Sequence, residues 1–245
     1  MGSGYITQRK IEKEDYSPFK GIVDDSLTEV TADMLNGVTS ISSFAFYQCA
    51  NLISVDIPNS VTSIGSYAFN SCDSLASVTI PNGVTSIGNY AFSSCYSLAS
   101  VTIPNGVTSI SDMTFQSCYS LASVTIPSSV TSIGNSAFSY CRALTSITIP
   151  SSVTSLGSHA FYECRLVSSL TIPSSVTNIG GYAFASIPIL TSVTVESTTP
   201  PTIGTDIFSI YAGSTLVIYV PAESVEAYKT ATNWSTYASR IQAIP

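Results

Sequence analysis

The chain has 245 residues and a formal net charge of −7, yet only 9% of its residues are charged. An average domain has about 25%. No run of Lys and Arg is present, so neither a nucleic acid nor an anionic membrane is an expected partner. No apolar run reaches the roughly 18 residues of a membrane span, so membrane insertion is not expected either. Residues 1–16 lack the apolar core of a signal peptide, and none is predicted.

Residues 1–33 differ from the rest of the chain. Residues 1–20 are polar and mixed in charge, and we predict an N-terminal arm there. Residues 21–33 contain Leu27-Thr-Glu-Val30, which resembles the later segment Leu75-Ala-Ser-Val78 and is followed by a two-residue insertion. Because the first coil of a repeat array must not expose its core, we predict that residues 21–33 form an N-terminal cap.

From residue 34 to 194 the sequence repeats a 23-residue unit. A fixed period of roughly 20 to 50 residues predicts a solenoid, in which each unit buries its apolar face against its neighbours. We therefore predict a β-rich solenoid with a parallel sheet and seven coils. The phenylalanine position illustrates the period: Phe46, Phe69, Phe92, Phe115, Phe138, Phe161 and Phe184.

Each unit is expected to contain two short strands and a turn. In one unit, Val101 and Ile103 alternate with polar residues as in a half-buried strand, and Pro104 ends it. A second extended segment follows at residues 107–110. Glycine follows in most units and suggests a corner with special backbone angles. Apolar residues spaced by three, as in residues 91–98, then predict a short helical or 3₁₀ turn.

The six cysteines occupy one position of the repeat: Cys49, Cys72, Cys95, Cys118, Cys141 and Cys164. Phe and Leu positions flank them, so we predict small, buried and free thiols. Side chains that point the same way would have to reorient to form a disulfide. Ligands that lie one repeat apart along a stack do not converge on a point, so no metal site is expected.

Residues 195–245 are predicted to form a degenerate repeat and a C-terminal cap. Ile203 and Phe208 keep the five-residue spacing of earlier units. Residues 222–230 favour a helix with Val225 and Tyr228 on one side. Three further residues are expected to close the apolar end of the stack: Trp234, Tyr237 and Ile241.

The consensus LxxVxIPxxVTSIGxxAFxxCxxL over residues 34–194 resembles the BspA-type leucine-rich repeats. This resemblance implies a right-handed leucine-rich-repeat solenoid. Such repeats occur in surface and secreted proteins of gut and oral bacteria and in related phage-encoded proteins. The resemblance therefore implies adhesion or recognition at a cell surface, outside the cell or on a virion, but it names no ligand.

No constellation of catalytic residues is visible. His159 is the only histidine, and the sequence places no fixed nucleophile and orienting acid beside it. A phosphate-binding glycine loop, an HExxH motif and paired carboxylates are absent. We therefore expect no catalytic residues, no cofactor and no enzymatic activity.

Two surface arrays remain as candidate binding sites. The first lies on the longer strands, where hydroxyls between inward residues suit either a solvated β-face, a carbohydrate or peptide site, or an ice-binding lattice. The second lies on the turn side, where Tyr and Arg either recognise a partner or cover the turn. The strand array is Ser77, Thr79, Ser100, Thr102, Ser123, Thr125, Ser146 and Thr148; the turn array is Tyr67, Tyr90, Tyr96, Tyr119, Tyr140, Arg142, Tyr162, Arg165 and Tyr182.

Three functional hypotheses follow. The first is a recognition or adhesion module that contacts a host protein or a glycan, as a bacterial surface protein or a phage tail-associated protein. The second is a structural spacer or assembly protein that docks through residues 1–20. The third is an ice-binding solenoid, which Ser in place of Thr and the expected sheet curvature disfavour.

Overall fold

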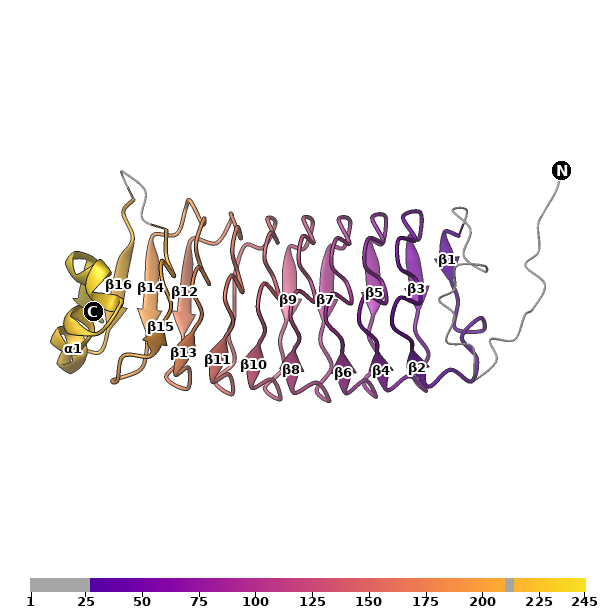
Figure 1. Cartoon of the computed structure of the whole chain (residues 1–245), viewed down its shortest axis with the longest axis horizontal. Helices are drawn as coiled ribbons and strands as arrows, with labels where there is room; N and C mark the ends of the chain where they lie inside the picture. The colour runs from indigo at the N-terminus through magenta and orange to yellow at the C-terminus, as the bar shows by residue number, and fades with distance from the viewer. Residues whose placement is uncertain (1–26, 210–213) are drawn as a thin grey trace.

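The computed structural model describes residues 27–209 and 214–245, which form one long rod of stacked coils (Figure 1). The strand β1 (Glu29–Val30) lies near one end, and the helix α1 (Val225–Thr230) lies at the other. Every strand pair in the described residues is parallel. The predicted parallel β-solenoid is thereby confirmed. The predicted arm, residues 1–20, lies outside the described residues.

The longer strands form one row along the rod, which we call the main face. Each carries an inward Val, Leu or Ile beside outward residues, mostly Ser and Thr, because successive side chains of a strand point to opposite sides. On this face, the coil between β9 and β12 has no named strand and contributes an isolated bridge from Thr148 to Thr171. The row contains β1, β3 (Ser54–Asp56), β5 (Ser77–Thr79), β7 (Ser100–Thr102), β9 (Ser123–Thr125), β12 (Ser169–Ile172), β14 (Ser192–Val195) and β16 (Val217–Val220).

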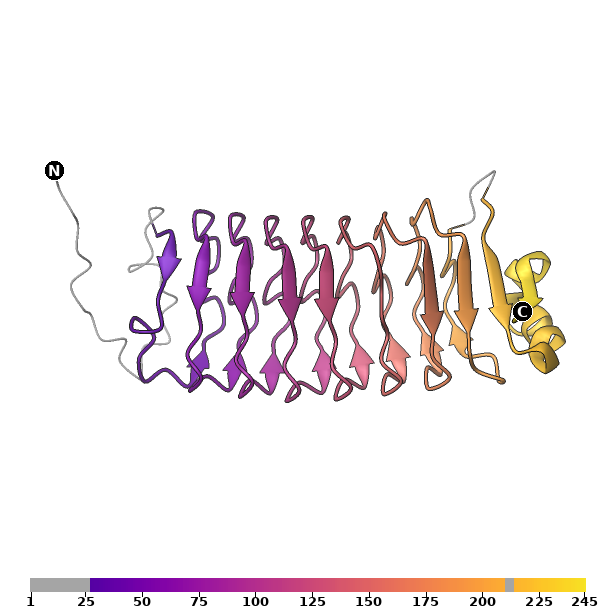
Figure 2. The same cartoon turned by 180° about the vertical axis from the view of Figure 1, so that it is seen from behind.

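A second row consists of two-residue strands, visible along the lower part of the coils in Figures 1 and 2. Each strand places one Ile or Leu in the core beside a more exposed polar residue. The row contains β2 (Ser40–Ile41), β4 (Ser63–Ile64), β6 (Ser86–Ile87), β8 (Ser109–Ile110), β10 (Ser132–Ile133), β11 (Ser155–Leu156), β13 (Asn178–Ile179) and β15 (Thr202–Ile203).

The strand register follows the sequence repeat. Ser77 pairs with Ser100, and Ser100 pairs with Ser123, each one repeat further along the chain. At the N-terminal end Glu29 pairs with Ser54, and this longer step accommodates the two-residue insertion. At the other end Ser192 pairs with Val217, a step that is longer than one repeat by the same amount. Counted along the main face with the bridge at Thr148, the solenoid has about nine turns.

Identical side chains stack on one another in the core. The Phe rings form a continuous parallel stack from Phe46 to Phe208, with neighbouring centroids 5.1–5.9 Å apart. The six cysteines are buried and none of them forms a disulfide, as predicted. From Cys72 onward each thiol also donates to the carbonyl oxygen of a Phe in the preceding coil; Cys118 Sγ, for example, lies 3.2 Å from Phe92 O.

The segment after each second-row strand is a run of turns, so the predicted helical or 3₁₀ turn is wrong. Along this segment, the backbone amides donate in turn to a carbonyl of the same coil and to a carbonyl of the next coil. Ala91 N donates to Gly88 O in the same coil, whereas Phe92 N donates to Thr114 O in the next coil at 2.9 Å. Tyr90 (φ 59°) and Ser94 (φ 60°) are left-handed, which a helix does not allow. Apolar spacing by three also fits consecutive β-turns. We call this side, residues 44–50 and their equivalents to 182–188, the turn edge.

The repeated glycine has a different cause from the one predicted. Within the described residues the only glycine with a positive φ is Gly37. At Gly88, a Cβ atom would lie 2.5 Å from Ser66 N in the preceding coil. The equivalent Gly157 would place a Cβ atom 2.5 Å from Asn135 N. Glycine is therefore required because two backbones approach closely, not because of an unusual dihedral angle.

One coil departs from this pattern. The second row is divided into a three-stranded sheet that ends at β6 and a five-stranded sheet that begins at β8. At this division Ser111 occupies the glycine position, and its hydroxyl donates to Ile87 O at 2.6 Å. Thr114, in the usual alanine position, is fully buried and donates to Ser111 O at 2.8 Å. The serine Cβ thus separates two neighbouring strands.

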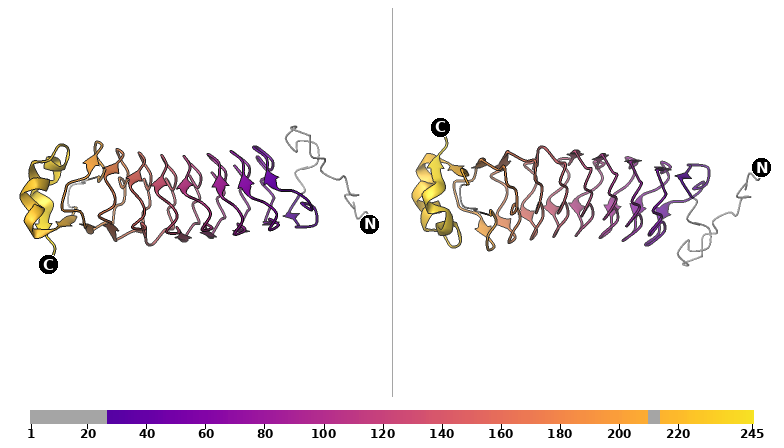
Figure 3. Two further views of the ribbon diagram at one scale, coloured as in Figure 1. Left: turned by 90° about the horizontal axis from the view of Figure 1, so that it is seen from below. Right: turned by 90° about the horizontal axis from the view of Figure 1, so that it is seen from above.

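Within the described residues, helical structure is confined to the C-terminal end of the rod (Figure 3). It comprises η1 (Ala222–Ser224), α1 and η2 (Trp234–Arg240), followed by β17 (Ile241–Ala243), which pairs with β16. Trp234 is fully buried, and its Nε1 donates to Pro201 O at 2.8 Å. The hydroxyl of Tyr237 bonds to both the amide and the carbonyl of Phe208, each at 3.2 Å. These rings cover the last coil of the Phe stack.

Candidate functional site

The strand array lies exposed on the main face, as expected for outward residues of a strand. Ser77 and Thr79 flank the buried Val78, and the same pattern recurs in β7. The array is not continuous: the first main-face sheet ends at β9, and the next begins at β12. Thr148 lies between them with a single bridge. Because the row of hydroxyls is interrupted, the structure disfavours functions that need a regular lattice, such as ice binding.

The turn edge carries a second ordered array. The residues that follow each cysteine or its equivalent form what we call the post-cysteine row: Ala50, Asp73, Tyr96, Tyr119, Arg142, Arg165 and Pro188. The rings of Tyr96 and Tyr119 stack with centroids 5.0 Å apart. The guanidinium of Arg142 lies 5.0 Å from the Tyr119 ring and 5.4 Å from the Tyr140 ring. These are cation–π distances, so the four side chains form one preorganised group.

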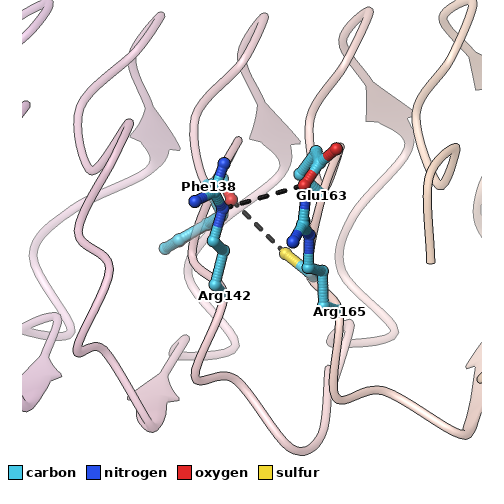
Figure 4. Close-up of polar contacts among 5 residues, drawn as sticks. Phe138, Arg142, Glu163 and Arg165 are labelled. Carbon is cyan, nitrogen blue, oxygen red and sulfur yellow. Dashed lines mark hydrogen bonds and ion pairs between the residues drawn. The ribbon is translucent and has the colours of Figure 1, made fainter. Parts of the chain in front are cut away.

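A charged group extends this arrangement (Figure 4). Glu163 lies between two arginines on neighbouring coils and forms ion pairs with Arg142 Nε, at 3.7 Å, and with Arg165 Nε. The arginine side chains are 41% and 49% exposed, whereas that of Glu163 is only 14% exposed. Two arginines share one carboxylate, so the group carries a net positive charge on a chain whose total charge is −7.

Another row of the turn edge consists of left-handed residues, and we call it the positive-φ row: Phe44, Tyr67, Tyr90, Met113, Ser136, His159 and Tyr182. Phe44 stacks on Tyr67 at 4.8 Å, and Tyr67 stacks on Tyr90 at 4.5 Å. Desolvation, followed by the neighbouring Tyr90 hydroxyl, raises the pKa of Tyr67. Further along, His159 stacks on Tyr182 at 5.0 Å. Every member of this row except Met113 and Ser136 therefore carries a ring.

The predicted turn array divides into local groups. Tyr67 and Tyr90 form a pair towards the N-terminal end of the row. Sequence reasoning left out Phe44, Tyr47 and His159, although Phe44 and His159 share a repeat position with three of the chosen tyrosines. The larger group, joined through ring and ion-pair contacts, contains Tyr96, Tyr119, Tyr140, Arg142, Tyr162 and Arg165, and His159 connects it to Tyr182.

The single histidine of the chain belongs to the same array. The two ring contacts of His159 are with Tyr162 and Tyr182. No set of three His, Cys, Asp or Glu residues in residues 27–209 and 214–245 is arranged to hold a metal ion. Burial raises the pKa of the Cys118 thiol to about 12, so at neutral pH this thiol is not a nucleophile. In the same ranges, no helix has the length and apolarity that crossing a membrane requires.

A comparison with known protein families identifies the family of this chain. The model of the BspA type leucine rich repeat region matches in six copies over residues 23–145 and 131–230. The chain belongs to this family. The observed solenoid is therefore a leucine-rich-repeat solenoid, and the resemblance seen in the 23-residue consensus is confirmed.

Two solved structures are similar to the chain. The T. pallidum leucine rich repeat protein is 28% identical, over 74% of this chain and 75% of that chain, with a TM-score of 0.50. A leucine rich cell surface protein from Faecalibacterium prausnitzii A2-165 is 29% identical, over 79% of this chain and 69% of that chain, with a TM-score of 0.47. No curated protein matches the chain.

Proposed function

We propose that this BspA-type protein is a non-enzymatic recognition module that binds a host protein or glycan through its turn edge, at a bacterial surface or on a phage tail. One observation carries the proposal. Tyr96, Tyr119 and Arg142 form an exposed, mutually stacked row at repeat positions that vary between otherwise near-identical coils. Variable positions are where an array of identical units distinguishes one partner from another.

The side chains of this row suit a binding surface. Tyr96 and Tyr119 are 39% and 40% exposed, so part of each side chain is accessible to a partner. Tyr and Arg are among the residues that most often dominate the binding energy of interfaces. Because the rings and the guanidinium already stack on one another, little side-chain entropy is lost when a partner binds.

A binding screen tests the proposal. The purified protein is applied to a glycan array and to a panel of host extracellular-matrix proteins, beside a variant that combines Tyr96→Ala, Tyr119→Ala and Arg142→Ala. The matched control combines Ser77→Ala, Ser100→Ala and Ser123→Ala on the main face. We expect a partner that the control retains and the turn-edge variant loses. Equal binding by both variants would contradict the proposal.

The spacer hypothesis gives a different result in the same assay. Deletion of residues 1–20 would abolish attachment, whereas the turn-edge variant would attach normally. The ice-binding hypothesis is tested separately in cold solution by thermal hysteresis, and the interrupted main-face array predicts that none will be measured.

A further inference from the structure

A depression interrupts the turn edge at Ser136. Its volume is about 380 Å³, and its walls include Gln116, Tyr140, His159, Tyr162 and Tyr182. The depression is shallow and widely open to solvent, so it can accommodate one part of a larger ligand. The depression adjoins the post-cysteine row, because Tyr140 also contacts the guanidinium of Arg142.

The sequence explains why the depression lies there. The positive-φ row carries rings at Phe44, Tyr67 and Tyr90 on one side and at His159 and Tyr182 on the other. Ser136 occupies the same repeat position and has no ring. The space that a tyrosine fills elsewhere in the row is therefore open beside His159.

Aromatic rings form much of the wall. His159 stacks on Tyr182 with an interplanar angle of 21°, so its opposite ring face is directed towards Ser136 along the row. Tyr162 makes edge contacts with His159 and with Tyr140, both at 5.4 Å between centroids. Each of these rings is held by another ring, so the wall is formed before any ligand arrives.

Besides the rings, the depression is lined by amide and hydroxyl groups. Within the described residues the side chains of Gln116 and Ser136 make no hydrogen bond. No lining side chain is a carboxylate, an ammonium group or a guanidinium group. The nearby charges of Arg142 and Glu163 form an ion pair with each other. An uncharged ligand with several hydroxyls matches this set better than an anion or a cation does.

We propose that this depression binds one residue of a neutral saccharide, whose apolar ring face packs on His159 while Gln116 and Ser136 bond to its hydroxyls. Ring stacking supplies contact area, and a few placed polar groups supply specificity, as is usual in small-ligand sites. This inference rests on the proposed function, because it assigns a ligand class to one part of the turn edge. An aromatic side chain of a protein partner is the competing occupant.

The test uses a variant that fills the site without disturbing the fold. Ser136→Tyr introduces the residue that three other coils carry at this left-handed position. Its ring is expected to stack on His159 as Tyr67 stacks on Tyr90, so the thermal transition should be unchanged or higher. Saturation-transfer difference NMR is then recorded with methyl glycosides of glucose, galactose, mannose and N-acetylglucosamine, and with N-acetyl-tyrosine amide as the aromatic probe.

We expect at least one glycoside to give a signal that falls at least tenfold in Ser136→Tyr and persists in Tyr96→Ala, which lies outside the depression. If no glycoside gives a signal, or if Ser136→Tyr leaves the signal intact, the saccharide assignment is wrong. A signal from the aromatic probe alone, lost in Ser136→Tyr, would also overturn it. In each of these cases the proposed function still stands if the Tyr96, Tyr119 and Arg142 variant loses a protein partner.

Discussion

The hydroxyl of Ser111 donates a 2.6 Å hydrogen bond to the carbonyl oxygen of Ile87, where six other coils use the backbone amide of a glycine. In those coils the amide-to-oxygen distance is 2.8 Å, and the two backbones are too close for a Cβ atom. Where serine replaces glycine, the second row of strands is divided. A single Cβ atom therefore decides whether neighbouring coils pair on this side of the rod.

Gly157→Ala should destabilise the protein markedly. The new Cβ would meet backbone atoms of the preceding coil at 2.5 Å, and forced overpacking typically costs about 1–3 kcal/mol. Gly83→Ala is the matched control, since its Cβ would find only ordinary contacts, the nearest at 3.4 Å. Denaturant unfolding of both variants measures the difference, and equal midpoints would show that the close approach does not constrain the fold.

Phe115→Ala should cost about 3–5 kcal/mol, as large truncations in a core do. Its ring is fully buried and lies between Phe92 and Phe138 in the stack, at 5.5 and 5.4 Å. Ser100→Ala, on the exposed side of β7, should change the free energy of unfolding by less than about 0.5 kcal/mol. Similar losses in the two variants would contradict the assignment of inward and outward positions.

The buried thiols predict that stability falls at alkaline pH. Burial raises the pKa of Cys118 to about 12, whereas an unfolded cysteine ionises near about 8.5. At a pH between these two values the folded state keeps a proton that the unfolded state releases. The stability that this thiol contributes is therefore fully present below the pKa of the unfolded state and is lost as the pH rises towards the pKa of the folded state. The limiting slope is about 1.4 kcal/mol per pH unit for each such thiol.

Cys118→Ser tests this dependence, because serine keeps a hydrogen-bond donor towards Phe92 O but does not titrate in this range. The free energy of unfolding is measured between about pH 8 and 10.5 under reducing conditions. We expect the variant to lose stability less steeply than the unmodified protein above about pH 9. Parallel curves would mean that Cys118 ionises alike in both states.

Tyr237→Phe should lower the free energy of unfolding by about 1–3 kcal/mol, because the Phe208 amide and carbonyl lose their buried partner. Tyr119→Phe removes the same atom from an exposed ring and serves as the control. Chemical denaturation compares the two. No difference would indicate that water replaces the lost hydroxyl at the C-terminal cap.

Sequence periodicity predicts most of this fold, because each apolar column has the same role in every coil. The inward Phe, Cys and Ile residues and the outward Ser and Thr residues of the strands follow directly from it. The turn edge could not be derived in the same way. Spacing by three fits a helix as well as β-turns, and only the alternating hydrogen bonds between coils, with Tyr90 and its equivalents left-handed, distinguish them.

The candidate site was predictable in composition but not in arrangement. The tyrosines and arginines could be selected because they vary between coils. Their grouping depends on contacts between columns, such as Arg142 over Tyr140 and Tyr162 against His159, which a repeat alignment does not show. The depression at Ser136 arises because this residue has no ring. The sequence could not show this, because the stacking of the neighbouring rings is seen only in the structure.

The central claim is that the turn edge is the recognition surface. It is tested most directly by measuring how variants of the turn edge and of the main face bind an identified partner. Surface plasmon resonance gives the dissociation constant for the unmodified protein, for the Tyr96, Tyr119 and Arg142 alanine variant, and for the Ser77, Ser100 and Ser123 alanine variant, with folding checked by circular dichroism. If the turn edge is the recognition surface, the first variant binds at least tenfold more weakly and the second binds unchanged. Loss of binding only in the main-face variant would contradict the account.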